Sequence, residues 1–335
     1  MLGRFDPELA DLTRREAARQ RATLNLIASE NFASPLTAGM EGSIWANRNV
    51  EGCPGKRFVA GCERADRVEV LAIERAKQLF GAEPAHVQAM SATIDYAGFS
   101  EIAQSVGALL FVDLAHNVGL VAGGVIPSPV PYADVVSTST HKTFRGPRGG
   151  GLVLCRKEPA AKIDRAVFPG LQGAPKLDMI AARAVLFREC MTDAYRRYAA
   201  QVVANARALA EGCHASGLRL VSGGTDTHLA LVDVTGLIPT GREAEAALAA
   251  VDIIGNRNGI PFDTQPPNIA SGLRIGSPAL TTRGMKEAAF LRVGTLLGQV
   301  LKQRDDAAAL AAIRTERADL AGRYPLFAAE WMPEA

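Results

Sequence analysis

The sequence has few cysteines and no long apolar stretch, and both absences limit what the protein is. Its 335 residues include 5 cysteines, an odd number scattered along the chain. This usage predicts reduced thiols in a cytoplasmic protein rather than a disulfide framework. No apolar run approaches the roughly 20 residues that cross a bilayer, and the polar, charged N-terminal segment predicts no signal peptide. We therefore expect a cytoplasmic globular protein with no membrane partner.

An excess of charge of one sign is also lacking. Lys and Arg number 37 and Asp and Glu 35, which gives a net charge of +2 without any block of like charge. Proteins that bind nucleic acid present a basic stripe to the phosphates, so we expect no nucleic-acid partner. With 48% hydrophobic and 21% charged residues, the composition is that of a globular chain rather than a disordered one.

Hydrophobic periodicity predicts an α/β layer in the first half of the chain. Helices are expected at 6–23, 62–80 and 99–106, with a loop over 24–35. Strands are expected at 86–89, 108–112, 134–140 and 151–155. Strands separated by helices favour a mostly parallel sheet, and the continuous apolar run at 108–112 predicts a strand that is buried on both faces.

Alanine-rich helices predominate after about residue 185. They are expected at 179–189, 194–215, 244–250 and 285–303, with strands at 218–221 and 228–234. Thr240 and Glu243 have the spacing of a capping box at the start of the third of these helices. We expect a second, α+β domain, and we divide the chain into an N-terminal helix and arm at 1–35, a large domain at 36–190 and a small domain at 191–335.

Two of the predicted strands end in chargeable side chains. The strand at 108–112 runs into Asp113 and His116, and the strand at 134–140 runs into His141 and Lys142. Ligands of open α/β sheets bind outside the carboxyl ends of the strands, which favours a site at this edge. On spacing alone, a structural Asp–Lys ion pair is an equally good interpretation.

The glycines that follow Lys142 favour a ligand site over a plain ion pair. Residues 145–151 read RGPRGGG, and glycine permits a ligand to approach the backbone closely. The motifs GxGxxG and GxxxxGK[ST] are absent, which excludes the dinucleotide and P-loop interpretations. A lysine and an aspartate at one edge suit pyridoxal phosphate, because the lysine forms a Schiff base and the aspartate contacts the pyridinium nitrogen.

Seven blocks of the sequence resemble serine hydroxymethyltransferase and follow the order of that family. They are LIASEN (26–31), EGCPGKR (51–57), VDLAH (112–116), THKTFRGPRGG (140–150), VFPGLQG (167–173), SGGTDTH (222–228) and SGLRIGSPA (271–279). The resemblance implies a fold-type-I pyridoxal-phosphate enzyme, with an α/β large domain and a smaller α+β C-terminal domain. It also implies a cytoplasmic homodimer with shared active sites, which interconverts serine and glycine with tetrahydrofolate.

The resemblance also implies roles for particular residues around the cofactor. Lys142 would form the Schiff base and Asp113 would contact the ring nitrogen. His116 would lie by the phenolic oxygen of the cofactor, and His141 would lie beside the lysine. The phosphate contacts that remain are Ser91 and, from the partner subunit, Gly173. No metal ion is implied.

Three further residues are implied to act on the amino-acid substrate, which would be serine, glycine or another β-hydroxy amino acid. Arg274 would bind the carboxylate in a bidentate geometry that lysine cannot copy, and Ser29 would assist it. Glu51 would handle the proton of the substrate hydroxyl while the carbon–carbon bond breaks.

The sequence departs from the family in one stretch and at several single positions. After residues 90–92 it lacks a segment of roughly 80 residues relative to the usual length, which would carry most of the phosphate turn, the ring-stacking histidine and part of the folate pocket. Its loss leaves 108–112 as an apolar edge strand, which invites pairing with other chains. Residues that replace family tyrosines are Asn49, Phe58 and Val59, and Phe262 replaces an asparagine that contacts the pterin.

These departures leave three functions open. The first is serine hydroxymethyltransferase activity with folate. The second is a folate-independent aldolase, transaldolase or 2-methylserine hydroxymethyltransferase type of reaction. The third is an inactive, truncated homologue that acts by dimerisation.

Overall fold

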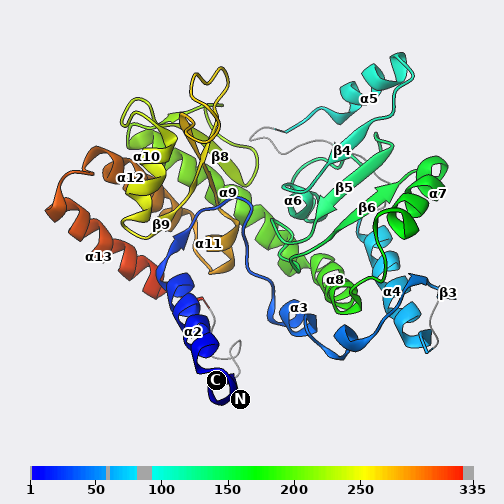
Figure 1. Ribbon diagram of the computed structural model, residues 1–335. Helices are drawn as coiled ribbons and strands as arrows, with labels where there is room; N and C mark the ends of the chain where they lie inside the picture. The colour runs from blue at the N-terminus through cyan, green and yellow to red at the C-terminus, as the bar shows by residue number, and fades with distance from the viewer. Residues whose placement is uncertain (1, 58–60, 81–92, 327–335) are drawn as a thin grey trace. The chain divides into compact units, whose positions relative to one another are not determined.

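The computed structural model describes residues 2–57, 61–80 and 93–326, and the chain folds into two compact units. Residues 31–200 form one unit, and residues 1–30 fold together with 201–335 as the other (Figure 1). The N-terminal helix and the arm up to Glu30, predicted as part of a separate segment, therefore belong to the C-terminal unit.

Among its described residues, the unit of 31–200 contains a sheet of three strands in the order β4-β5-β6 (Figure 1). Strand β4 (Phe111–Asp113) pairs in parallel with β5 (Val135–Ser139), and β5 pairs antiparallel with β6 (Gly151–Cys155). The described strands thus form one parallel and one antiparallel pair, so the expectation of a mostly parallel sheet is wrong for this part of the chain. The strand predicted at 86–89 lies outside the described residues.

Strand β4 is shorter and more exposed than the sequence predicts. Val112 is fully buried, whereas Phe111 is 49% exposed and Leu109, just before the strand, is 71% exposed. Successive side chains of a strand point to opposite faces, and the described residues cover only one face of β4. The expectation of burial on both faces is therefore wrong.

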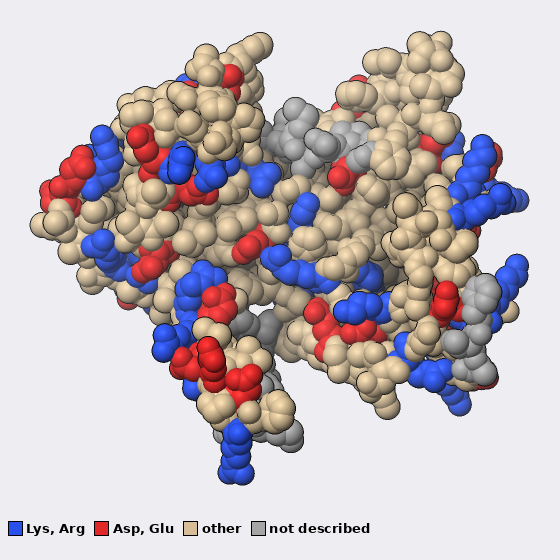
Figure 2. Space-filling view, viewed as in Figure 1, with Lys and Arg blue, Asp and Glu red and all other residues tan. Residues whose placement is uncertain are grey.

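Exposed apolar side chains continue from β4 onto helix α5 (Tyr96–Ser105). The residues concerned are Phe99, Ile102, Val106, Leu109 and Phe111. In Figure 2 this region, at the upper right, is mostly free of charged side chains. Monomeric soluble proteins rarely expose large contiguous apolar patches of this kind.

Helices cover the rest of this unit. They are α3 (Pro35–Met40), α4 (Glu63–Phe80), α6 (Val118–Ala122), α7 (Lys157–Arg165) and α8 (Leu177–Cys190), with short turns at η1 (Ile44–Asn47) and η2 (Ala166–Leu171) and a hairpin of β2 (Gly52–Cys53) and β3 (Lys56–Arg57). The predicted helices at 62–80, 99–106 and 179–189 are confirmed. Helix α4 packs against α8, and the Arg75 guanidinium donates to the Ala184 carbonyl at 2.7 Å across that contact.

The other unit is built on a four-stranded antiparallel sheet in the order β10-β11-β8-β7. Its strands are β7 (Arg219–Leu220), β8 (Leu229–Asp233), β10 (Asn256–Asn258) and β11 (Gly272–Gly276). Its helices are the C-terminal part of α9 (Asp193–Ala215), α10 (Gly241–Ala249), α11 (Pro278–Thr282), α12 (Glu287–Lys302) and α13 (Ala307–Arg323). Strands β7 and β8 and helices α9, α10 and α12 confirm the prediction, whereas β10, β11 and α13 were not predicted.

Helix α10 begins as its sequence predicts. The Thr240 hydroxyl accepts the Glu243 N–H at 3.2 Å, which satisfies one of the unpaired donors of the first turn. Helices α10 and α12 contribute Leu248, Phe290 and Leu297 to one hydrophobic core with Ile275 of β11.

The N-terminal segment is bound into this same unit. Helices α1 (Leu2–Phe5) and α2 (Pro7–Ala22) come first, and β1 (Leu24–Asn25) then pairs in parallel with β9 (Ile253–Ile254), where the sequence predicts only a loop. The buried Arg283 side chain donates to the carbonyls of Arg21 and Thr23 at 3.1 and 2.9 Å. It also donates to the carbonyls of Ala321 and Tyr324 at 2.8 and 2.7 Å. One guanidinium therefore ties α2 to the end of α13.

All five cysteines are free thiols, as the sequence predicts. Within the described ranges, no helix has both the length and the apolar character to cross a membrane.

Replacement of Arg283 by methionine tests the tie between the two ends of the chain. Arg283→Met leaves several buried carbonyls without a donor, so we expect the free energy of unfolding in urea to fall by about 2–4 kcal/mol. The control is Arg323→Met, because Arg323 is 60% exposed and pairs with an equally exposed Asp319; its effect should stay within about 0.5 kcal/mol. Equal stability of the two variants would contradict the structural role of Arg283.

Candidate active site

The parallel pairing of β4 with β5 brings the carboxyl ends of both strands to one edge. Asp113 is the last residue of β4 and lies opposite Ser137 of β5, and the turn that carries His141 and Lys142 follows β5. The Asp113 carboxylate accepts the Ala115 N–H at 2.8 Å, which fixes its orientation at the strand end. Asp113, His116, His141 and Lys142 are all half-buried.

The turn around Lys142 is closed by its own hydrogen bonds. The Thr140 carbonyl accepts the Gly146 N–H at 2.6 Å, and the Thr140 hydroxyl donates to the Pro147 carbonyl at 2.8 Å. A Cβ at Gly146 would lie 2.7 Å from the Thr140 carbonyl oxygen and 2.4 Å from Cδ2 of Leu186, so only glycine fits at this position. Gly146, one of the glycines noted in the sequence, thus shapes the turn through close packing.

A buried aromatic contact holds the same turn against the helices. Phe144, two residues after Lys142, is fully buried, and its ring centroid lies 5.8 Å from those of Phe80 on α4 and Phe187 on α8. Aromatic contacts of this kind stabilise beyond the burial of apolar area alone. The packing of Phe144 against α4 and α8 therefore holds the Lys142 turn in place.

Thr143 connects the Lys142 turn to the segment that carries His116. Its hydroxyl donates to the His116 carbonyl at 2.6 Å and accepts the Gly119 N–H at 3.1 Å. The Tyr195 hydroxyl donates to the Thr143 carbonyl at 3.1 Å. Burial raises the pKa of Tyr195 well above its usual value, so this hydroxyl remains a donor at neutral pH.

Asn31 fixes the backbone of Lys142 itself. Its side-chain amide donates to the Lys142 carbonyl at 3.0 Å and to the Tyr198 hydroxyl at 2.8 Å. Arg145 has a left-handed backbone (φ 63°), and its guanidinium lies 4.6 Å from the centroid of the Tyr198 ring. The backbone of Lys142 is thereby held by Asn31, which in turn contacts Tyr198, and both residues are distant from Lys142 in the sequence.

Gly173 and the hairpin next to Glu51 lie around a cavity of about 560 Å³. Its lining includes Gly52, Gly173 and, from β5, Ser137 and Thr138, but not Asp113, His116, His141 or Lys142. Glu51 itself is half-buried and directly precedes β2. The predicted residues of this unit therefore divide between the β4–β5 edge and this cavity, and Ser91 lies outside the described residues.

The two predicted carboxylate ligands, Ser29 and Arg274, belong to the other unit. Arg274 lies on β11 between β10 and β8. Its Nε is buried without a hydrogen-bond partner among the described residues, and burial lowers its pKa. A half-buried guanidinium whose Nε–H has no such partner is a fitting place for an anionic group.

The segment that leads to Ser29 lies against the end of β11. The Gly276 N–H donates to the Leu26 carbonyl at 2.8 Å, and a Cβ at Gly276 would lie 2.7 Å from Cα of Ala28. Ser29 therefore follows a segment that is packed next to the strand of Arg274.

Phe262 lies on an exposed loop of this unit, with its side chain fully in solvent and a left-handed backbone (φ 60°). The neighbouring Asp263 organises the loop by accepting the Ser271 hydroxyl at 2.6 Å and the Gln265 N–H at 2.9 Å. These hydrogen bonds lower the pKa of Asp263 to about 2.

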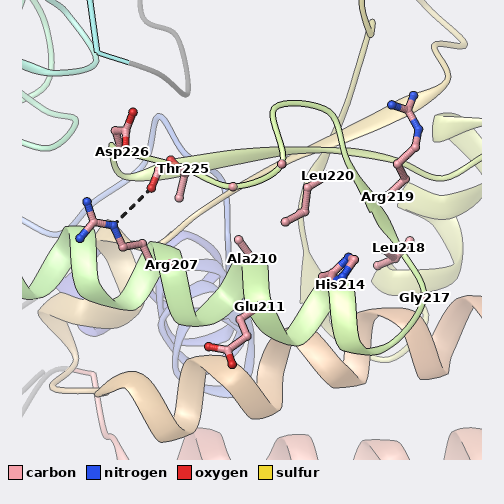
Figure 3. A pocket seen from close by; sticks show the side chains of 12 residues that line it. Arg207, Ala210, Glu211, His214, Gly217, Leu218, Arg219, Leu220, Thr225 and Asp226 are labelled. Atoms are coloured by element: carbon pink, nitrogen blue, oxygen red, sulfur yellow. Dashed lines mark hydrogen bonds between the residues drawn. The ribbon is translucent and has the colours of Figure 1, made fainter.

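A second cavity, of about 770 Å³, lies in this unit between α9 and residues 217–226 (Figure 3). It contains no predicted site residue. Both of its arginines have partners within the protein, because Arg207 donates to the Thr225 carbonyl at 3.4 Å and Arg219 pairs with Asp233 at 2.6 Å.

Sequence reasoning missed the residues that support the site. Asn31, Thr143, Tyr195 and Tyr198 were given no role, although Asn31 and Thr143 fall inside the blocks of family resemblance. Asn31 is 111 positions from Lys142 and Tyr195 is 52 positions from Thr143, and no periodicity of the sequence reports contacts of that range.

Comparison with known proteins gives a consistent match. The sequence matches the family model described as serine hydroxymethyltransferase over residues 2–92 and 85–297. It is 44% identical to the serine hydroxymethyltransferase of Coprothermobacter proteolyticus, over 84% of this chain and 88% of that protein. It is 41% identical to that of Myxococcus xanthus, over 98% of both chains, in an alignment of 409 residues that exceeds the 335 residues of this chain. The two matched segments meet at 85–92.

Replacement of Gly119 tests the support of the Lys142 turn. A Cβ there would lie 2.3 Å from the Thr143 carbonyl oxygen and 2.7 Å from the Tyr195 hydroxyl. We expect Gly119→Ala to displace the turn, to cost about 1–3 kcal/mol in urea unfolding and to reduce the visible absorbance that develops with added pyridoxal phosphate. Gly39→Ala is the control, because a Cβ at Gly39 meets nothing within 4 Å. An absorbance equal to that of the control would contradict this account.

Proposed function

Because the chain belongs to the serine hydroxymethyltransferase family of pyridoxal-phosphate-dependent transferases, we propose that it is an enzyme that cleaves β-hydroxy amino acids with bound pyridoxal phosphate. The observation that carries the proposal is the Lys142 turn, which is anchored at the carboxyl end of β5 beside the β4 strand that ends in Asp113.

The residues of the β4–β5 edge fit this cofactor. Lys142 would hold it covalently, and Asp113 would keep a proton on its ring nitrogen. The cofactor, when bound, supplies an electron sink for the negative charge that forms on the substrate carbon. His116 would contact its phenolic oxygen and His141 would pack beside Lys142, while Ser91 and Gly173 would contact the phosphate.

Arg274, Ser29 and Glu51 would act on the substrate. The unused Nε–H of Arg274 supports binding of a carboxylate, and Ser29 would add a hydroxyl donor. Glu51 would accept the proton of the substrate hydroxyl as the bond between the α- and β-carbons breaks and the aldehyde leaves. The α-carbon would then take up a proton to give glycine. Proton transfer to a positioned group contributes about 10²- to 10⁴-fold in rate.

We propose that tetrahydrofolate plays little part in this reaction. Phe262 supports this, since its exposed ring offers no hydrogen bond where the family has an asparagine. The length of the alignments with relatives also supports the loss of an internal segment near residues 85–92, where the two matches to the family model meet. Part of the folate pocket would lie in that segment.

We propose that the enzyme works as a homodimer in the cytoplasm. Gly173 and the hairpin next to Glu51 line a cavity whose lining does not include Asp113 or Lys142, which suits sites assembled from two copies. The exposed apolar side chains of α5 and β4 favour a second candidate function, that of a truncated homologue that acts through association with other chains.

Arg274→Lys tests the substrate site. It keeps the charge but loses the planar fork, and a lost charge-assisted hydrogen bond of about 1.5–3 kcal/mol weakens glycine binding by about tenfold or more. The measurement is the change in visible absorbance of the cofactor-loaded protein during titration with glycine. Arg257→Lys on the neighbouring strand β10 is the control, because Arg257 pairs with Glu245. Equal titrations of the two variants would remove Arg274 from the site.

The folate dependence has its own test. We expect glycine release from phenylserine without folate, and release from serine that tetrahydrofolate does not increase. The matched variant is Phe262→Asn, which places the family's asparagine at this position. Asparagine adopts the left-handed backbone found here more readily than phenylalanine does, so the variant should be at least as stable as the parent protein. A large stimulation of the parent protein by folate would show that the pocket survives.

A further inference from the structure

The hairpin that follows Glu51 is held by one buried arginine. Arg57, on β3, has a side chain that is only 4% exposed. Its Nη1 donates to the Val50 carbonyl at 2.7 Å and to the Gly52 carbonyl at 2.5 Å. These two carbonyls are the ones on either side of Glu51.

The other nitrogens of Arg57 are bound to helix α4. Nε donates to Asp66 at 2.7 Å and Nη2 donates to Glu69 at 2.5 Å. Burial acts to lower the pKa of Arg57, but its hydrogen bonds to Glu69 and Asp66 outweigh burial and raise it. The guanidinium is therefore a permanent charge that links the backbone around Glu51 to a packed helix.

The backbone of Glu51 is fixed from its other side as well. The Asn49 side chain accepts the Glu51 N–H at 3.1 Å. Gly52 has φ 105°, and a Cβ there would lie 2.4 Å from the Lys56 carbonyl oxygen, so the chain turns tightly directly after Glu51. The backbone polar groups around Glu51 are thus held while its own side chain stays half-exposed.

We propose that Arg57 is a positioning residue that acts through Glu51, by holding the two flanking carbonyls and so aiming the carboxylate at the substrate hydroxyl. This inference rests on the role proposed above for Glu51. A lysine at this position keeps the charge but lacks the planar fork that reaches two carbonyls and two carboxylates together.

The first experiment measures the backbone without any reaction. Hydrogen exchange of the amides at 49–57 in the cofactor-free chain should become faster in Arg57→Lys and remain unchanged in Arg64→Lys, an exposed position of α4. Unchanged exchange in Arg57→Lys would overturn the proposal, whatever the fate of the proposed function.

The second experiment is a double-mutant cycle of Arg57→Lys with Glu51→Gln, read as phenylserine cleavage by the cofactor-loaded enzyme. Misplacement of a reacting group by about 1 Å costs up to about 100-fold in rate, so Arg57→Lys should lower kcat at least about tenfold with little change in KM. In the Glu51→Gln background the same change should have almost no effect, because an interaction that acts through Glu51 is not additive with its loss.

The outcomes of the cycle separate the two proposals. If Arg57→Lys lowers kcat equally in the parent enzyme and in the Glu51→Gln background, Arg57 is merely structural. If Glu51→Gln alone leaves kcat unchanged, the role proposed for Glu51 fails and this inference fails with it.

A milder variant keeps the cycle decisive if Arg57→Lys does not fold. Asp66→Asn loosens the hold on Arg57 but retains its guanidinium, and it should give a smaller fall in kcat that again disappears in Glu51→Gln. Persistence of that fall in Glu51→Gln would likewise overturn the proposal.

Discussion

The parallel pairing of β4 with β5 is the contact on which the candidate site depends. It sets Asp113 at the edge from which the Lys142 turn emerges. Hydrogen bonds from Thr143 to the His116 carbonyl and from Asn31 to the Lys142 carbonyl then fix that turn. Burial of Phe144 between α4 and α8 supplies the apolar anchor, so a small sheet is enough to hold a lysine at a defined place.

The chemistry of the proposed reaction is divided between two units of different construction. The unit of residues 31–200 carries the residues proposed to hold the cofactor at a strand edge, and the other carries Arg274 on the inner strand β11 of an antiparallel sheet. In both units the candidate side chains stand on a strand or in the turn that follows one, and neighbouring backbone is packed closely, as at Gly146 and Gly276. Rigid elements of this kind hold a site more precisely than free loops.

Much of the secondary structure could be predicted because its signals are local. Helix α4 follows from apolar periodicity, and α8, α9 and α12 follow from their alanine-rich sequences. The edge with Asp113 and Lys142 follows from two strands that end in charged residues. Strand β10 has the polar sequence Asn256–Asn258 and its neighbour β11 is interrupted by Arg274, so neither reads as a strand. The exposure of β4 was also missed, because an apolar run alone does not report how many strands remain beside it.

The supports of the site could not be predicted for a related reason. Arg57, Asn31 and Tyr195 act through backbone carbonyls, and such contacts leave no pattern in a sequence. The resemblance to a family implied the roles of Lys142 and Arg274. Only the structure reveals the unused donor of Arg274 and the hydrogen bonds from Arg57 to the carbonyls of Val50 and Gly52, on either side of Glu51.

The central claim is that Lys142 holds pyridoxal phosphate in this chain. The most direct measurement is borohydride reduction of the protein after incubation with the cofactor, followed by peptide mapping by mass spectrometry. The account predicts one modified lysine per chain, in the peptide that contains Lys142. Modification spread over exposed lysines such as Lys56 and Lys302, or no modification at all, would contradict it.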